Sequence, residues 1–432
     1  MNAPASTITQ PFEYHGKRVL ITQRALADLA GSEMVVYELA DFLLTQGAKP
    51  TIYTYYFSEP IGACFEEAGL SVIDSDNTKL KWQDFDYVWV QHQVLPKSLV
   101  DQLAKPIPGR PSVVFHHMSV LGQVPIERPY IWDLENRLSS LSLFCSSEVR
   151  DGLSSMLRAD VPLALFPNPA PMEFTGVPEV PAGTLRRIAI VSNHPPDELK
   201  QAKELLTAQG IDVVSFGRHQ DRHSLMTADV IRGFDAVITI GKTVQYCLVS
   251  GIPVYVYDHF GGPGWLNDSV FPDAEYANFS GRGFARRDPS AITTEITEGV
   301  RSAAAFQSEH RDQFISTYSI ATALPRVLES ASANVRPFGQ FSPQYVAYLA
   351  GQHSLARQMI RQTFQLKQSV TRRDIQLADL AQDIQTLQDD AASQRQRADS
   401  IMQSQSYRLG DAIIKPLSLI KSALTNRQAA KS

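Results

Sequence analysis

The stretch that decides the fold is TIGKTVQYCLVSGIPVYVYDHFGGPGWL, residues 239–266. The apolar run 236–240 predicts a buried strand, and residues 253–257, rich in β-branched and aromatic side chains, predict a second one. Between them, apolar residues recur at helical spacing as far as Gly251, a typical helix stop. The stretch is therefore one strand–helix–strand unit with a polar loop after each strand. Ligands of open parallel α/β sheets bind at that edge.

These two loops favour an anion-binding site. Gly241 allows the backbone to approach a ligand closely, and a helix that begins near Thr243 directs free N–H groups and its positive dipole end outward. Lys242 adds a mobile positive charge. Gly261 and Gly262 are expected to supply backbone donors from across a gap that would suit a pyrophosphate. The alternative is a structural βαβ unit with tight turns.

The sequence IGKTVQY…GIPVYVYDHFGGPGWL resembles the donor-binding half of GT-B glycosyltransferases, of the family-4-like kind found in bacterial capsule and O-antigen gene clusters. In that family, a strand–helix–strand unit with GIPV at its second strand and a Gly-Gly loop after it holds a nucleotide sugar. The resemblance implies an α/β chain of the GT-B class, with two Rossmann-like parallel-sheet domains that face a cleft. The donor would lie against the second domain.

The resemblance also implies donor contacts elsewhere in the second half. The loop at Asn193 lies near the donor phosphates in the family, and Arg218 is the candidate for a basic residue that follows it. Retaining members carry a pair of glutamates in this unit, but the corresponding positions here are Ile238 and Tyr246. The usual sugar and ribose contacts are therefore absent or supplied by other residues.

Asp258 and His259 are the nearest polar replacements for that pair, and Asp258 is also a catalytic candidate. The full set of expected donor-binding residues is Asn193, Arg218, Gly241, Lys242, Thr243, Tyr246, Asp258, His259, Gly261 and Gly262.

The first half opens with another strand–loop–helix–strand unit, from the strand 18–22 to the strand 50–56. Ser32 is suited to cap the helix between them, and Glu33 suits its positive end. Gly31, Ser32 and Glu33 stand where family-4-like enzymes carry a Gly-rich loop that faces the cleft. Capping without any ligand contact is the alternative.

Later strands of the first half each run into a polar cluster, at His92, His116-His117, Ser146-Ser147-Glu148 and Pro167-Asn168-Pro169. The last three clusters resemble landmarks of the family in order and spacing. We therefore expect His116 or His117 to contact the acceptor or the transferred sugar, as catalytic candidates. Structural hydrogen bonding is the alternative for both histidines.

Length and composition limit the function. A chain of 432 residues favours two domains and an extension, and a formal charge of −5 gives no argument for nucleic-acid binding. The three cysteines lie in or next to apolar runs, which is typical of reduced thiols in a cytoplasmic protein. The N-terminal residues do not resemble a signal peptide, and no apolar run is long enough to span a membrane.

Composition shifts predict the domain boundaries. In order, they are a disordered tail (1–13), an acceptor domain (14–170), a linker (171–185), a donor-binding domain with closing helices (186–330), a helical connector (331–365), a coiled coil (366–403), and an amphipathic helix and tail (404–432).

The coiled coil is predicted from an apolar seam whose steps alternate between four and three residues. Its positions are Leu366, Val370, Arg373, Leu377, Leu380, Ile384, Leu387, Ala391, Gln394, Ala398 and Ile401. The pattern predicts a homo-oligomer. The alternative is a lone amphipathic helix packed on its own catalytic domain.

Residues 410–424 have a different character. One helical face is apolar, and Lys415 and Lys421 flank it, so the segment is suited to the headgroup region of an anionic membrane. The residues of this apolar face are Ile413, Ile414, Leu417, Ile420 and Leu424. Docking onto a partner protein is the alternative.

These observations predict a cytoplasmic glycosyltransferase, peripheral on the inner membrane, that moves a hexose or deoxyhexose from a nucleotide sugar to a growing, possibly lipid-linked surface polysaccharide. The nucleotide sugar is a co-substrate, and neither a cofactor nor a metal is expected, because the resemblance implies a GT-B enzyme and these generally need no bound metal. The first alternative is a catalytically inactive GT-B scaffold that assembles a polysaccharide-synthesis complex through its coiled coil. A sugar-nucleotide epimerase is a third possibility.

Overall fold

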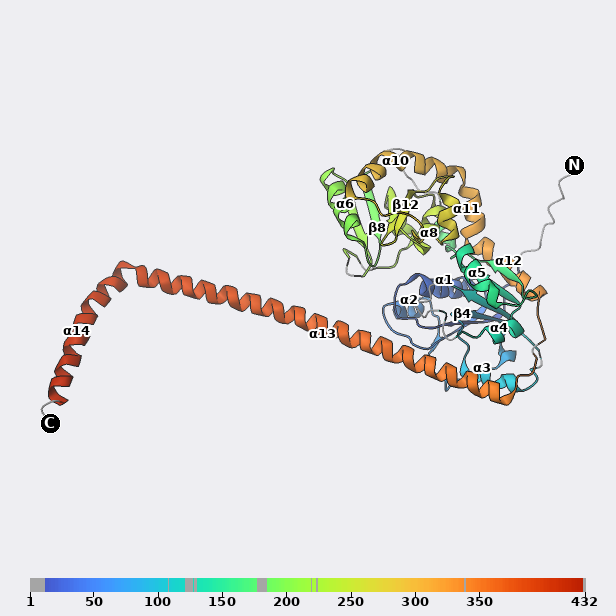
Figure 1. Ribbon diagram of the computed structural model, residues 1–432, viewed down its shortest axis with the longest axis horizontal. Coiled ribbons are helices and arrows are strands. Elements are labelled where there is room, and N and C mark those ends of the chain that lie inside the picture. The colour runs from blue at the N-terminus through green and yellow to red at the C-terminus, as the bar shows by residue number, and fades with distance from the viewer. Residues whose placement is uncertain are drawn as a thin grey trace. The chain divides into compact units, whose positions relative to one another are not determined.

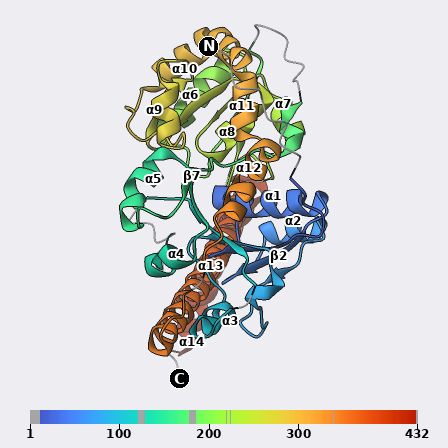
Figure 2. The same cartoon turned by 90° about the vertical axis from the view of Figure 1, so that its right-hand side faces the viewer.

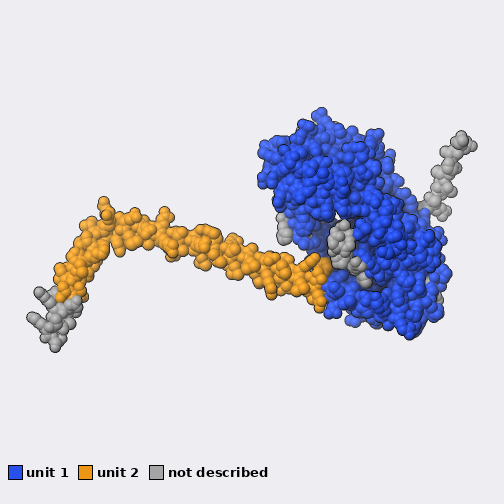
Figure 3. Space-filling model, in the orientation of Figure 1, with its two compact units in different colours: residues 1–361 blue, residues 362–432 orange. Residues whose placement is uncertain are grey.

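The computed structural model describes residues 12–429 except 108, 121–126, 128–129, 177–184, 219, 223 and 338. Most of the expected tail 1–13 and of the expected linker 171–185 therefore lies outside the described residues. The chain divides into two compact units, residues 1–361 and residues 362–432 (Figure 3).

Alternating strands and helices of the first unit build two β-sheets (Figures 1 and 2). The first sheet is parallel throughout and has the order β3-β2-β1-β4-β5-β6-β7. Its strands are β1 (Arg18–Gln23), β2 (Lys49–Thr54), β3 (Val72–Ile73), β4 (Tyr87–Gln91), β5 (Ser112–His117), β6 (Leu141–Phe144) and β7 (Leu163–Leu165). Its early helices are α1 (Gly31–Thr45), α2 (Ile61–Glu67), α3 (Lys97–Val100), α4 (Trp132–Leu138) and α5 (Ser147–Leu153).

The second sheet has the order β12-β11-β10-β8-β9, and only its edge strand β12 is antiparallel to its neighbour. Its strands are β8 (Arg187–Val191), β9 (Asp212–Phe216), β10 (Ala236–Thr239), β11 (Val254–Asp258) and β12 (Gly261–Trp265). The helices around it are α6 (Asp197–Ala208), α7 (Ala228–Arg232), α8 (Lys242–Ser250), α9 (Phe271–Tyr276), α10 (Pro289–Glu309) and α11 (Arg311–Tyr318).

The unit that opened the sequence analysis folds as predicted, into β10, α8 and β11. Gly251 ends α8 in the left-handed conformation, with φ of 74°, where glycine carries no steric penalty. Both sheets are doubly wound. Their strand orders change direction between β1 and β4 and between β8 and β10. Ligands of such sheets bind at these switch points.

The closing segments return to the first domain. α12 (Ile320–Ala333) buries Leu324 and Leu328 in the core that contains Val19 of β1. The sequence predicted that the closing helices as far as residue 330 belong to the second domain, but the chain breaks at Ser319, between α11 and α12. There Ala170 donates its N–H to Tyr318 O and accepts from Ile320 N, at 2.6 and 2.9 Å, which turns the chain back to the first sheet.

The long helix α13 (Pro343–Gln403) begins inside the first unit, so residues 343–365 of the expected connector and the expected coiled-coil segment 366–403 form one continuous helix. His353 is buried between the hydroxyl groups of Tyr53 and Tyr55, each 3.3 Å from a ring nitrogen. Arg357 and Asp76 form an ion pair at 2.6 Å. The first turns of α13 are therefore part of the core of the first domain.

In the second unit, α13 continues and is followed by α14 (Gln405–Ala429), whose side chains are described as far as Ala423. Leu424 of the expected apolar face therefore lies outside the described side chains. The large apolar residues of the heptad seam are each more than half exposed, and so are Ile413, Ile414, Leu417 and Ile420. Within the described part of the chain, no helix has the length and apolar character needed to cross a bilayer.

Candidate functional site

A cleft of about 500 Å³ lies where the carboxyl edges of the two sheets meet. Both switch points open into it, and almost all of its polar lining follows a strand end. From the first domain these residues are Gly31 and Ser32 after β1, His92 after β4, Ser119 after β5 and Asn168 after β7. From the second domain they are Ser192–His194 after β8, Gly217 after β9, Gly241–Thr243 after β10, and Asp258 and His259 at the end of β11.

The N-termini of α1 and α8 approach each other in this cleft. A Cβ atom on Gly31 would lie 3.7 Å from Cβ of Lys242. Gly241 precedes α8 with φ of 62°, and its N–H donates to Phe279 O at 2.9 Å. The first N–H groups of a helix have no intrahelical acceptor, and its N-terminus carries partial positive charge. Two such ends make this part of the cleft suitable for an anion, as the sequence predicted for α8.

The side chain of Lys242 is engaged rather than mobile. Its Nζ lies 2.7 Å from Glu38 Oε2 of α1 and donates to Pro169 O at 2.7 Å. Tyr246 donates its hydroxyl to the other oxygen of Glu38. We call Glu38, Lys242 and Tyr246 the interdomain clasp, since it joins α1 to α8. Burial raises the pKa of Glu38 and lowers the pKa of Lys242, and their mutual attraction opposes both shifts.

Asp258 ends β11 with its carboxylate buried in the wall of the cleft. It accepts from the Ser192 hydroxyl at 2.9 Å and from the N–H of His259 at 2.8 Å. Burial raises the pKa of Asp258, and these hydrogen bonds oppose the shift. The side chain of His259 is about half exposed. Among the described residues, no group of three or more His, Cys, Asp or Glu side chains could hold a metal ion.

Two arginines form further ion pairs between the domains. Arg218, predicted to bind the donor, pairs with Asp28 and is not among the residues that line the cleft. Its backbone N–H donates to Asn193 Oδ1 at 2.9 Å, which closes the loop after β8. Arg282 does line the cleft, and its Nε lies 3.1 Å from Glu148 Oε1. The sequence analysis missed Arg282, which is marked only by the glycines on either side of it.

His116 and His117 do not line the cleft. The sequence predicted that the strand ends before them, at the edge of the sheet, but β5 continues through both, so they are buried strand residues. His117 Nε2 lies 2.9 Å from Glu135 Oε1, and Nδ1 lies 3.4 Å from Glu127 Oε2. Burial opposes a charge on this ring, but the two carboxylates outweigh it and raise the pKa of His117 to about 10. The expected contact with an acceptor is not supported by this position.

His92 lines the cleft, as His194 and His259 also do, and the sequence analysis gave it no role. It follows β4 with φ of 51°, an uncommon conformation for a residue with a side chain. Within the described part of the chain, neither of its buried ring nitrogens has a hydrogen-bond partner. Burial lowers the pKa of His92 to about 4, so the ring is neutral near pH 7. Strain and unpaired polar atoms together point to a functional side chain.

The Gly31-Ser32-Glu33 loop only partly matches its prediction. Gly31 and Ser32 line the cleft, but Ala30 precedes the helix and no side chain caps it, so Ser32 is not the cap. Glu33 turns away from the cleft, and its carboxylate accepts from the N–H groups of Ala27 and Asp28 at 2.5 and 2.8 Å. Burial raises the pKa of Glu33 to about 7.

Gly261 and Gly262 are also outside the cleft lining. The sequence predicted a loop here, but both residues belong to β12, which pairs with β11. A Cβ atom on Gly262 would lie 1.9 Å from Val256 O. Their lack of side chains therefore serves the packing of backbone against backbone.

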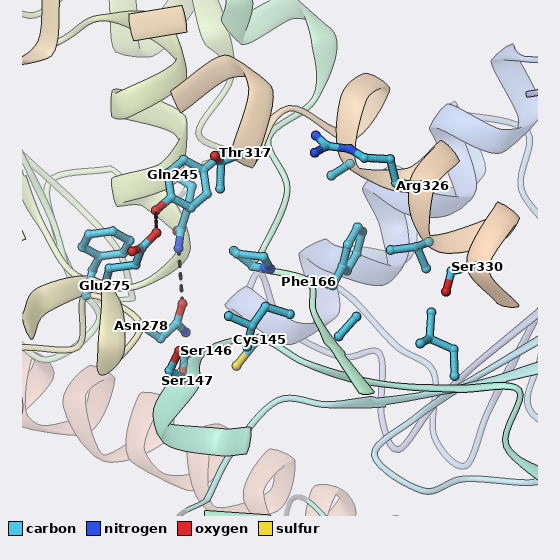
Figure 4. A pocket seen from close by; sticks show the side chains of 18 residues that line it. Cys145, Ser146, Ser147, Phe166, Gln245, Glu275, Asn278, Thr317, Arg326 and Ser330 are labelled. Carbon is cyan, nitrogen blue, oxygen red and sulfur yellow. Dashed lines mark hydrogen bonds between the residues drawn. The ribbon is translucent and has the colours of Figure 1, made fainter. Parts of the chain in front are cut away.

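A second cavity of about 300 Å³ lies among β7, α8, α9 and α12 (Figure 4). Asn278 lines both this cavity and the cleft, and its Oδ1 lies 3.2 Å from Gln245 Nε2 of α8. On the far side, Arg326 and Ser330 come from α12 (Figure 4).

No protein-family model matches the chain, and no curated protein matches it. Solved structures with a similar course of the backbone include Anabaena HepE in complex with UDP and glucose, at 12% identity, covering 73% of this chain and 100% of that chain, with a TM-score of 0.47. A glycosyltransferase from Rickettsia africae shares 13% identity over 74% of this chain and 98% of that chain, with a TM-score of 0.47. The glycotransferase of kitacinnamycin shares 15% identity over 73% and 99%, with a TM-score of 0.45.

The fold is GT-B. Two Rossmann-like sheets present their carboxyl edges to one cleft, and the closing helix α12 returns to the first domain.

Proposed function

We propose that this chain is a glycosyltransferase that moves a hexose or deoxyhexose from a nucleoside-diphosphate sugar to a glycan of a bacterial surface polysaccharide. The observation that carries the proposal is the cleft into which both switch points and two helix N-termini open. Two helix ends suit a diphosphate better than a single charge, and the resemblance around residues 239–266 supports a nucleotide sugar as its source.

The diphosphate would lie against Gly241, Lys242 and Thr243. Their backbone N–H groups and the dipoles of α1 and α8 would stabilise the anion that forms as the nucleoside diphosphate leaves. Lys242 would contribute its ammonium group, which it shares with Glu38. Asn193 and the neighbouring residues of the loop after β8 would contact the rest of the nucleotide.

The acceptor would enter from the first domain, beside His92. In the proposed step, the acceptor hydroxyl oxygen forms a bond to the anomeric carbon, the bond from that carbon to the diphosphate oxygen breaks, and the hydroxyl proton moves to a neutral His92. Both ring nitrogens lack a hydrogen-bond partner among the described residues, so one of them can accept this proton. Asp258, held by Ser192, would orient the sugar hydroxyls.

The C-terminal unit supports a membrane surface as the location of this reaction. The apolar face of α14 and its flanking lysines suit an anionic inner-membrane surface on the cytoplasmic side, where a lipid-linked acceptor is presented. Self-association through residues 366–401 belongs to the same proposal.

One observation favours the alternative of an inactive scaffold. The positions that correspond to the family's glutamate pair are buried, and at one of them the Tyr246 hydroxyl is bound to Glu38. If no carboxylate reaches the donor, the cleft could retain the fold without the reaction.

The test is a thermal-shift screen of UDP-, GDP- and dTDP-sugars, followed by calorimetry on the best ligand. A glycosyltransferase should be stabilised by one nucleotide class and should release the nucleoside diphosphate when membrane extract supplies an acceptor. His92→Gln should abolish release and retain binding, whereas the control variant His15→Gln, at an exposed residue outside the cleft lining, should retain most of the release. Absence of stabilisation by every nucleotide would support the scaffold instead.

A further inference from the structure

The residues of the apolar seam on α13 indicate how many chains would associate and in which orientation. We propose that residues 366–401 pair with the same residues of a second copy as a parallel, in-register, two-stranded coiled coil. The seam lies on one helix, and its large apolar residues are each more than half exposed. At 1.5 Å per residue this stretch is about 54 Å long, roughly five heptads.

The residue types at the seam favour two strands. Counting heptads from Leu366 as position d places Val370 and Ile384 at a, and Leu380 and Leu387 at d. Branched residues at a with leucine at d favour a parallel dimer over trimers and tetramers. Leu377 at a and Ile401 at d depart from this pattern, so the preference for two chains rests on Val370 and on the layers from Leu380 to Leu387.

Charge complementarity sets the orientation. In a parallel, in-register pair, Asp390 at g faces Arg395 at e of the second copy. Arg373, a polar lapse at d, packs against the second copy's Asp374 at e. Each of these contacts occurs twice, and no like-charged pair faces across the g and e positions. Arg373 at d also faces Arg373 of the second copy, so the two Asp374 side chains must balance two adjacent guanidinium groups.

The antiparallel arrangement is less favourable. If the same stretch overlapped itself in the opposite direction, Asp383 of each copy would face Asp390 of the other, so that two pairs of like charges would meet. Asp374 would face Arg395 at two further places, so the opposite charges would only offset the like ones, whereas the parallel pair has no like charges across g and e. Gln394, the second polar lapse, would face a leucine. In the parallel pair it faces its own copy, and two amides can then hydrogen-bond to each other and hold the register.

This orientation has a consequence for the C-terminal helix. In a parallel pair, both copies of α14 follow the same end of the paired helices. Two amphipathic helices that act together bind a membrane more tightly than one, because the second binding event is intramolecular. An antiparallel pair would place them at opposite ends.

Disulfide trapping in the full-length protein tests the orientation. Cys145 and Cys247 are buried, so a Cys64→Ser background removes the partly exposed thiol. Gln394→Cys at d is then compared with Gln396→Cys at f, the outer face of the same turn. We expect the first variant to form a disulfide-linked dimer in a glutathione buffer and the second to remain unlinked. Wild type should sediment at twice the chain mass.

Several results would overturn the proposal. A Gln394→Cys chain that cross-links only when mixed with Leu377→Cys would show an antiparallel pair. Sedimentation of wild type as a monomer or trimer at about 100 μM would reject the dimer. Leu380→Asp combined with Leu387→Asp should abolish the dimer and leave unfolding of the first unit unchanged. A dimer that survives these substitutions would exclude this seam.

Discussion

Replacing Glu38 with glutamine, Lys242 with methionine, or both, should reveal a strong coupling between the two residues. They belong to different domains, their charged atoms lie 2.7 Å apart, and their side chains are only 6% and 5% exposed. Removing one partner of a buried ion pair leaves an uncompensated charge and costs about 3–5 kcal/mol, whereas replacing both is much less costly.

The cost of each single change follows from the group left behind. After Lys242→Met, Glu38 can take up a proton, which costs about 3.5 kcal/mol at pH 7 for a carboxyl group of ordinary pKa. After Glu38→Gln, the lysine can lose its proton, at about 4.5 kcal/mol. These values are upper limits. Because the pKa of Glu38 is already raised by burial, the Lys242→Met penalty should shrink to about 1 kcal/mol at pH 5.

Urea unfolding of wild type, both single variants and the double variant measures this coupling, with tryptophan fluorescence and circular dichroism as two probes. We expect the double variant to recover at least about 2 kcal/mol relative to the sum of the singles. If the losses in unfolding free energy of the two single variants sum to that of the double variant within about 0.5 kcal/mol, the two residues are not coupled. The clasp then does not hold the domains together.

Calorimetry with UDP separates the clasp from the proposed phosphate contact. If the ammonium of Lys242 reaches the diphosphate, Lys242→Met should weaken binding by about 1–3 kcal/mol. Glu38→Gln should then weaken binding less, because the lysine remains and can take its proton back beside the diphosphate. Equal changes in the same direction would mean that the lysine acts only in the clasp.

The other predictions concern the base, the pH dependence and the membrane. His92→Gln should lower kcat about 100-fold or more with unchanged UDP affinity, and unchanged turnover would remove His92 from the mechanism. Burial opposes a charge on His117, but two carboxylates outweigh it and raise its pKa to about 10. The contribution of His117 to the free energy of unfolding should therefore be complete below about pH 6.5. It should fall as the pH rises towards 10, by up to about 1.4 kcal/mol per pH unit. Urea titrations from pH 6.5 to 9.5 should show this slope in wild type and not in His117→Gln. Finally, Ile414→Asp with Leu417→Asp should abolish flotation with anionic liposomes, whereas Leu419→Asp, on another face of the helix, should not; equal flotation would indicate a protein-docking role for α14.

The architecture could be predicted from the sequence because it depends on local patterns. Buried apolar runs and the helix stop at Gly251 were enough to identify β10, α8 and β11. The residues that follow each strand could then be assigned to one edge of a sheet, since parallel strands share that edge. This reasoning located most of the cleft, including Gly241, Asn193 and Asp258.

The side-chain partners could not be predicted, because they come from distant parts of the chain. Nothing near Lys242 in the sequence indicates Glu38, and Arg218 lies 190 residues from Asp28. Strand length was the other limit. Two further residues in β5 convert His116 from an edge residue into a core residue, and no apolar pattern marks that difference.

The glycines of β12 restrict how this protein can diversify. Gly261 and Gly264 have φ of 86° and 82°, and Gly262 has no room for a Cβ atom against Val256. Substitutions in the GGPG string are therefore expected to destabilise the fold, so they cannot serve to change ligand preference. Changes in donor choice among descendants of this chain should instead accumulate at 192–194 and 224–226, which line the cleft. We therefore expect related chains to keep the GGPG string and to differ at these two short loops.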